Sequence, residues 1–130
     1  MEIDRTGLIL YVRKYSECVT FYQTVLGLPI LFQNSDLTCF DFFGTYLMVE
    51  IEDRVDYLEI DDGSLKNFSC LRMNVADVSF FSEALKEKNI YVDYQEHDWG
   101  TVAKFKDPDG NLIAFKDSKS FENQIESYSI

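Results

Sequence analysis

The feature that most constrains this chain is an internal repeat of strand, helix and three strands. An alternating apolar run that ends at Val12 is followed by a helical pattern that ends at Gly27, and the same order returns at Val75 and Asn89. The equivalent positions are 63 and 62 residues apart, so the period is nearly half of the 130-residue chain. We therefore predict an α+β protein made of two βαβββ modules, in which each helix covers its own half-sheet.

In the first module, apolar alternation over residues 8–12 predicts a strand. Ser16 is the expected N-cap of a helix that runs to Leu26, where Gly27 and Pro29 stop it. The strands expected after this helix are at about 30–33, 38–43 and 46–52.

The second module repeats this pattern with different residues. A strand over 70–75 is expected, followed by a helix that Asp77 caps and Asn89 closes. The remaining strands are predicted at 91–95, 101–105 and 112–116. The predicted boundaries within this single domain are module one at about 7–52, an acidic linker at 53–67, module two at about 68–117 and a polar tail at 118–130. In the tail, the spacing of Phe121, Ile125 and Tyr128 fits either a weak helix or a strap against a partner.

The charge of the chain bears on its partners. A net charge of -11 opposes binding to nucleic acid, because such binding depends on Lys and Arg that neutralise phosphates. No apolar run approaches the roughly 20 residues that a spanning helix needs, so no membrane partner is expected. Three cysteines without paired spacing and no secretory leader indicate a reduced, cytoplasmic protein.

Two short motifs carry a resemblance to a known family. The sequence FYQTVLGLPI at 21–30 follows the first strand, and DPDGN at 107–111 precedes the last one. With the duplicated βαβββ order, they resemble the glyoxalase, bleomycin-resistance and extradiol-dioxygenase superfamily, also called vicinal oxygen chelate proteins. The resemblance implies a curled mixed sheet around a cleft, and a homodimer, because members of the family commonly pair modules between chains.

The resemblance also implies four metal-ligand positions, one near the start and one near the end of each module. In this sequence they fall on Gly7, Glu50, Cys70 and Ala114, and only Glu50 is a typical ligand. Catalytic metals generally need about three protein ligands, so we expect neither a metal nor another cofactor. The single histidine, His97, is interpreted as an exposed or structurally satisfied residue rather than a ligand.

Strand alternation predicts which side chains face the cleft, because residues two apart share a face. The expected cleft residues, which include aromatic candidates for stacking on a ligand, are Ile9, Tyr11, Phe40, Phe42, Tyr46, Met48, Glu50, Cys70, Arg72, Asn74, Trp99, Leu112, Ala114 and Lys116. For Phe40, Phe42 and Phe43 a place in the core is the alternative. An ion pair between Glu50 and Arg72 is a further hypothesis, either for ligand recognition or for holding the cleft together.

Three functions remain after these exclusions. The favoured one is a metal-independent protein of the bleomycin-resistance type that sequesters an aromatic or cationic small molecule in a cleft of a dimer. The second is an enzyme of the same superfamily with a non-standard site, which would use acid–base groups such as Glu50, Tyr11 and Cys70. The third is an interaction protein whose own side chains fill the cleft.

Overall fold

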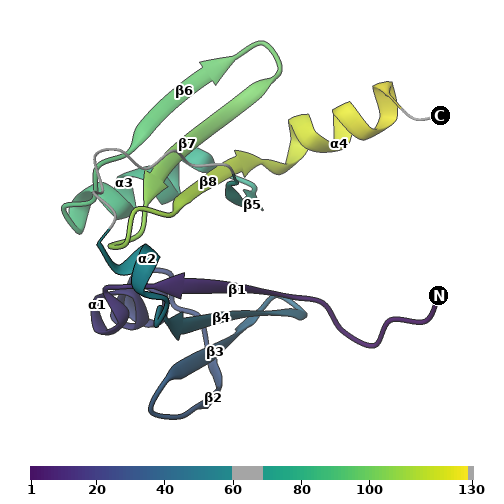
Figure 1. The fold of residues 1–130 in the computed structure, drawn as a ribbon. Coiled ribbons are helices and arrows are strands. Elements are labelled where there is room, and N and C mark those ends of the chain that lie inside the picture. Colours follow the sequence, from purple (N-terminus) through teal and green to yellow (C-terminus); the bar gives the residue numbers. More distant parts are fainter. Residues whose placement is uncertain (60–68, 129–130) are drawn as a thin grey trace. The chain divides into compact units, whose positions relative to one another are not determined.

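The computed structural model describes residues 1–59 and 69–128. The chain divides into two compact units, Met1–Leu65 and Lys66–Ile130. Each unit contains one four-stranded mixed sheet with helices attached (Figure 1). The predicted α+β class and the duplicated strand, helix, three-strand order are confirmed.

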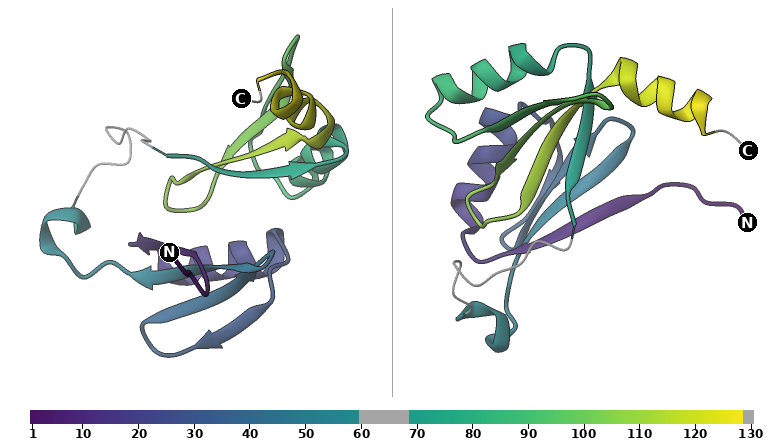
Figure 2. Two further views of the ribbon diagram at one scale, coloured as in Figure 1. Left: turned by 90° about the vertical axis from the view of Figure 1, so that its right-hand side faces the viewer. Right: turned by 90° about the horizontal axis from the view of Figure 1, so that it is seen from above.

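The first unit has the strand order β1-β4-β3-β2. Strand β1 lies parallel to β4, while β4, β3 and β2 are antiparallel to their neighbours. Helix α1 and the π-helical turn η1 that continues it pack on one face of this sheet, with α1 against β4 (Figure 2). The elements in chain order are β1 (Gly7–Val12), α1 (Tyr15–Thr20), η1 (Phe21–Val25), β2 (Ile30–Gln33), β3 (Leu37–Phe42), β4 (Thr45–Ile51) and α2 (Val55–Leu58).

The start of α1 corrects one prediction, because Ser16 is not its N-cap. The N-cap position is Lys14, whose side chain makes no capping hydrogen bond, and its carbonyl oxygen accepts from Cys18 N at 3.0 Å. Starting the helix at Tyr15 lets the phenol of that residue share a hydrogen bond of 2.7 Å with Thr38 Oγ1. A tertiary contact to the buried Thr38 therefore prevails over the local capping preference of serine.

The core of the first unit lies between α1 and the sheet. Its members without exposed surface are Val12, Cys18, Tyr22, Phe40, Leu47 and Val49. The helix ends as predicted, since Gly27 adopts a φ of +69°. In β4 the buried Leu47 and Val49 alternate with more exposed residues, which places these two on the helix-covered side.

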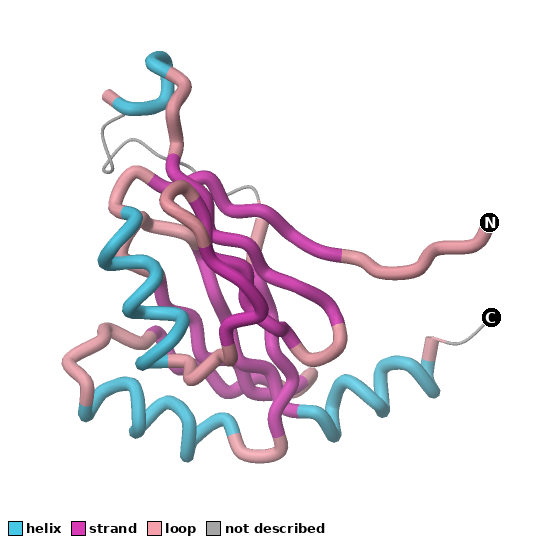
Figure 3. Tube along the Cα trace, turned by 90° about the horizontal axis from the view of Figure 1, so that it is seen from below, coloured by secondary structure: helices cyan, strands magenta, loops and turns pink. Residues whose placement is uncertain are grey.

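The second unit repeats the topology with the order β5-β8-β7-β6, again with a parallel outer pair, β5 and β8. Helix α3 packs against β7 and β8. Figure 3 shows that a further helix, α4, continues directly from the end of β8. The elements are β5 (Leu71–Val75), α3 (Val78–Glu87), β6 (Asp93–His97), β7 (Gly100–Lys106), β8 (Leu112–Asp117) and α4 (Ser118–Ser127).

Helix α3 begins and ends where the sequence predicts. The Asp77 side chain accepts a hydrogen bond of 3.1 Å from Phe80 N, and Asn89 beyond the C-terminus has a φ of +61°. Strand β6 begins two residues later than predicted, and Val92, just before it, is buried. On the helix-covered face, the Phe115 ring lies 5.2 Å from Phe105 and 5.3 Å from Phe81.

The predicted linker and tail both contain helix where the structure describes them. Helix α2 falls within the segment read as linker, and residues 60–68 of that segment lie outside the described residues. The tail sequence fits either a weak helix or a strap, and the structure has a helix there, α4. In the two described stretches, 1–59 and 69–128, no helix is long and apolar enough to cross a bilayer.

Candidate functional site

The sheet face of the first unit that lies opposite α1 carries most of the cleft residues predicted there. In the parallel register of β1 and β4, Gly7 pairs with Tyr46, Ile9 with Met48, and Tyr11 with Glu50. Tyr11 is 48% exposed and Ile9 is 38% exposed, whereas the side chains on β4 are half-buried. The strands therefore bring an aromatic, apolar and acidic set together on one face.

Two of the predicted aromatic residues lie elsewhere in this unit. Phe40 pairs with Leu47 on the helix-covered face and is fully buried, with its ring 6.1 Å from Tyr22. Phe42, two residues further on, shares that face and meets the exposed Phe43 edge to face at 5.3 Å. Phe40 is therefore a core residue, in agreement with the alternative considered for it.

The first expected metal-ligand position, Gly7, is covered by a neighbouring side chain. A Cβ built on Gly7 would overlap the ring of Tyr46, its cross-strand partner. Tyr46 thus occupies the volume in which a ligand side chain at this position would begin. Of the expected ligand positions in this unit, Glu50 does carry a carboxylate. It lies on the same face, in the pair Tyr11–Glu50, with the pair Ile9–Met48 between it and Gly7–Tyr46.

In the second unit, the predicted cleft residues share the sheet face opposite α3. The register pairs Arg72 with Ala114 and Asn74 with Lys116, and Cys70 precedes β5 on the same side. Arg72 and Asn74 are exposed, and the Arg72 guanidinium lies 5.5 Å from the centre of the Phe121 ring on α4. Leu112 begins β8 and is half-buried.

The four expected positions do not fit a catalytic metal. Desolvation raises the pKa of the Cys70 thiol above its ordinary value, although the nearby charges of Lys104 and Arg72 lower it, and the same two charges oppose a divalent cation at this position. Ala114 supplies no donor and lies in register between Arg72 on β5 and Lys104 on β7. Among the described residues, no three His, Cys, Asp or Glu side chains form a group suited to a metal ion.

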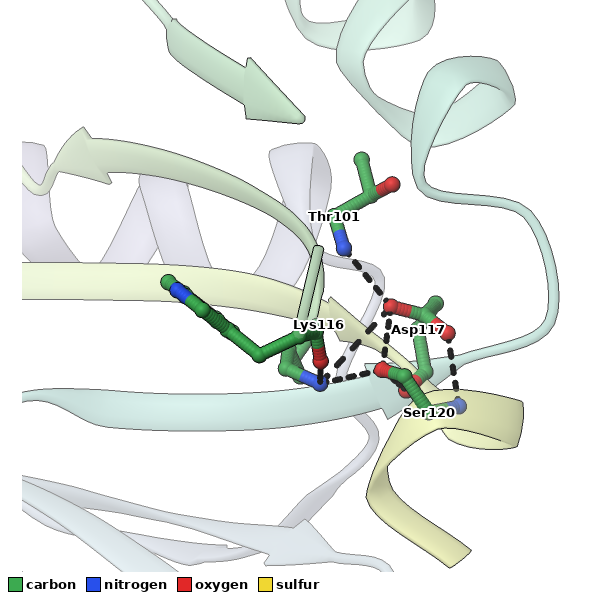
Figure 4. A network of polar contacts seen from close by, with 5 residues as sticks. Thr101, Lys116, Asp117 and Ser120 are labelled. Atoms are coloured by element: carbon green, nitrogen blue, oxygen red, sulfur yellow. Dashed lines mark hydrogen bonds and ion pairs between the residues drawn. The ribbon is translucent and has the colours of Figure 1, made fainter. Parts of the chain in front are cut away.

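Lys116, a further predicted residue, lies in a partly buried polar network with Asp117 and Ser120 (Figure 4) and also approaches Trp99. The Lys116 ammonium has almost no exposed surface and lies 5.5 Å from the centre of the Trp99 ring. Its Nζ donates to Ser120 Oγ and, at 3.4 Å, to the carbonyl oxygen of Trp99. Asp117 Oδ1 lies 3.7 Å from the same nitrogen.

Asp117 joins this network to both neighbouring elements. Its carboxylate accepts hydrogen bonds from Thr101 N at 2.8 Å and from Ser120 N at 2.8 Å, so it caps α4 and ties that helix to β7. Burial raises the pKa of Asp117, but the bonds from Ser120 and Thr101 and the charge of Lys116 outweigh it, and the pKa falls well below its ordinary value. The network makes the tail part of the second unit.

His97 lies beside this network at the end of β6. Its ring stacks on Trp99 with centroids 4.4 Å apart, and its Nε2 is hydrogen-bonded to Gln95 Oε1 at 2.8 Å. These contacts fit the interpretation of His97 as a satisfied surface residue.

A cluster that sequence reasoning missed follows β4 in the first unit. Arg54 donates through Nε and Nη2 to the two carboxylate oxygens of Glu52, both at 2.7 Å. Its guanidinium carbon also lies 4.9 Å from the Tyr11 ring centre and 4.3 Å from that of Tyr57. The hydrogen bond from Arg54 lowers the pKa of Glu52 to about 2, although desolvation opposes the shift. The sequence gives no periodic signal for this cluster, because its residues stand in a charged stretch that reads as linker.

The predicted partners Glu50 and Arg72 belong to different units. Each lies on the sheet face of its unit that is opposite the first helix of that module. Their ion pair stays a prediction.

Two mixed sheets of order 1-4-3-2, each formed by a strand, a helix and three strands, define a duplicated α+β protein of the vicinal oxygen chelate type. The chain belongs to the glyoxalase-like domain family, whose model matches residues 6–120. The predicted resemblance to the glyoxalase and bleomycin-resistance superfamily is thereby confirmed.

Individual proteins similar to this chain include one sequence relative and two solved structures. Protein YraH of Bacillus subtilis (strain 168) is 30% identical over 115 residues, which cover 80% of this chain and 90% of YraH. Lactoylglutathione lyase from Agrobacterium tumefaciens matches with a TM-score of 0.71 at 16% identity, over 89% of this chain and 94% of its own. TnmS3, an antibiotic binding protein from Streptomyces sp. CB03234, matches with a TM-score of 0.68 at 24% identity, over 90% and 98%.

Proposed function

We propose that this protein binds a small planar compound, aromatic or cationic, without a metal ion, in the manner of the bleomycin-resistance-like members of its superfamily. The observation that carries the proposal is the state of the expected ligand positions. The ring of Tyr46 takes the space at Gly7, Ala114 has no donor, and the thiol of Cys70 lies close to the cationic charges of Lys104 and Arg72. At these expected positions the protein retains the family fold with residues that do not suit the usual metal.

The nature of the exposed sheet face supports a small-molecule ligand. Ile9, Tyr11 and Met48 offer apolar and aromatic surface, and Glu50 adds a carboxylate beside them. Faces of this composition bind flat organic molecules by stacking and burial, with one polar group to orient them. The net charge of -11 favours the approach of a cation. The similarity in fold to TnmS3, an antibiotic binding protein, is consistent with this class of ligand.

The proposal includes a homodimer that supplies the second wall of the ligand cleft. The exposed apolar side chains on this face of the first sheet, Ile9 and Tyr11, provide surface that a second copy would cover. Sedimentation velocity at micromolar concentration checks this part directly, and a monomer at every concentration would refute it.

A thermal-shift screen tests ligand binding. Planar aromatic compounds, in matched cationic, neutral and anionic forms, are added to the wild-type protein and to Tyr11→Ala. A ligand of the proposed site raises the Tm of the wild-type protein and has a smaller effect on Tyr11→Ala. The control is Tyr91→Ala, which removes a tyrosine that is 84% exposed in the second unit and should leave the shift intact.

Elemental analysis of the purified protein and melts with added manganese, nickel, zinc and iron test metal independence. A stoichiometric metal, with a Tm increase that Glu50→Ala abolishes, would overturn that part of the proposal and favour a superfamily enzyme with a non-standard site. If no metal and no compound shifts the melt, the ligand-binding proposal fails and the interaction protein with a filled cleft remains.

A further inference from the structure

The cluster of Glu52, Arg54, Tyr11 and Tyr57 has the composition of a recognition site for a flat cation. Two ring faces meet the guanidinium of Arg54 at 4.9 Å and 4.3 Å, and a carboxylate accepts two hydrogen bonds of 2.7 Å from it. Aromatic faces and a bidentate carboxylate are the two devices by which proteins bind planar cations. In this structure a side chain of the protein itself occupies the site.

The fold holds the carboxylate of Glu52 in place, whereas it does not hold the side chain of Arg54 in the same way. Glu52 is 5% exposed, and its backbone N donates to the carbonyl oxygen of Val12 at 2.9 Å, which anchors it beside β1. Arg54, by contrast, has a side chain that is 53% exposed. It precedes α2, a single turn of helix in which no residue is buried. Moving Arg54 therefore costs little packing, while Glu52 keeps its need for a cationic partner.

The geometry favours a planar cation over an ammonium group. Arg54 uses Nε and Nη2, two nitrogens on one edge of the guanidinium, to reach the two oxygens of Glu52. An amidinium or a guanidinium presents the same pair of parallel donors and the same flat face, whereas an ammonium presents neither.

We propose that Glu52, Tyr11 and Tyr57 form a subsite for an amidinium or guanidinium group of the ligand, and that Arg54 fills this subsite until such a ligand displaces it. The inference rests on the proposed function, because Tyr11 also belongs to the proposed ligand-binding face. It narrows the ligand to a compound with a flat cationic group, and it makes Arg54 a competing internal ligand.

Calorimetric titration with benzamidinium tests the inference. The wild-type protein, Arg54→Ala and the control Arg5→Ala, which removes an exposed arginine outside the cluster, are compared, and neutral benzamide serves as the control compound. Because a site that is mostly self-occupied binds with a correspondingly reduced affinity, Arg54→Ala should bind benzamidinium at least about 10-fold tighter than wild type. Benzamide and Arg5→Ala should show no such gain, and adding Glu52→Gln to Arg54→Ala should remove it.

A second measurement covers the case in which Arg54→Ala does not fold. In the wild-type protein, the Nε–H resonance of Arg54 should shift when benzamidinium is added and stay in place with benzamide. Equal affinities of wild type and Arg54→Ala, or an Arg54 resonance that ignores saturating benzamidinium, would overturn the inference. If neutral planar compounds still bind and depend on Tyr11, the proposed function survives that result; if no compound binds any variant, both fail.

Discussion

The pairing of Gly7 with Tyr46 gives the sharpest test of how the family's metal position has been filled. Within a strand, replacing glycine by alanine ordinarily stabilises a protein by about 0.5–1 kcal/mol, because the unfolded chain loses conformational freedom. At Gly7 the new methyl group would overlap the Tyr46 ring. Overpacking of this kind costs about 1–3 kcal/mol. We therefore expect Gly7→Ala to destabilise the protein by roughly 1–2 kcal/mol, against the usual direction for a strand.

Removing the ring should reverse the sign of this effect. In a Tyr46→Ala background the added methyl group meets open space, so Gly7→Ala should stabilise by about 0.5–1 kcal/mol. The coupling energy of the double-mutant cycle then equals the overpacking cost, about 1–3 kcal/mol. Urea unfolding followed by far-ultraviolet circular dichroism measures all four proteins of the cycle. If Gly7→Ala stabilises equally in both backgrounds, the ring does not occupy this space and the reasoning is wrong.

Two further predictions concern the polar clusters. Gly100→Ala should lower the free energy of unfolding in urea by about 1–3 kcal/mol more than Gly110→Ala does. Both glycines have a positive φ, but only at Gly100 would a Cβ also overlap Lys116 Nζ. Equal losses of stability in the two variants would contradict the network. The pKa of Glu52 is lowered from its ordinary 4.5 to about 2, so its stabilising contribution is complete above pH 4.5 and is lost as the pH falls toward 2. The midpoint of urea unfolding should drop over this range, and Arg54→Gln should flatten the drop; an unchanged pH dependence in that variant would show that the ion pair is not the cause.

The sequence was sufficient for the fold because the decisive signals are local. Gly27 and Asn89 end their helices in the left-handed conformation that these two residue types tolerate, and Asp77 caps α3 through its own side chain. These signals recur at equal spacing in both halves of the chain, so each supports the other. Local signals fail at Ser16, where a contact between Tyr15 and Thr38, 23 residues away, sets the start of the helix.

The polar clusters could not be predicted from the sequence, because the residues that form each cluster are far apart in the chain or lie in a charged stretch without a recognisable pattern. The network around Lys116 needs Gly100 and Ser120 to approach it from two different elements. Only the capping role of Asp117 can be recognised from the sequence, because an aspartate before a polar helical segment is a typical N-cap. It is not among the predicted caps, because the spacing in the tail fits both a helix and a strap. For Glu52 and Arg54, spacing in a charged stretch says nothing about the rings that the guanidinium meets.

The proposal of metal independence depends on what replaces the ligands rather than on their absence alone. At Gly7 the replacement is steric, because a ring fills the space where a donor would stand. At Ala114 it is electrostatic, because Arg72 and Lys104 flank this position in register and oppose a divalent cation. Restoring a carboxylate by Ala114→Glu should therefore yield an ion pair with these two residues and no metal binding. Stoichiometric zinc or manganese binding by Ala114→Glu alone, measured by calorimetry, would show that the filled space at Gly7 and the positive charges around residue 114 do not prevent metal binding.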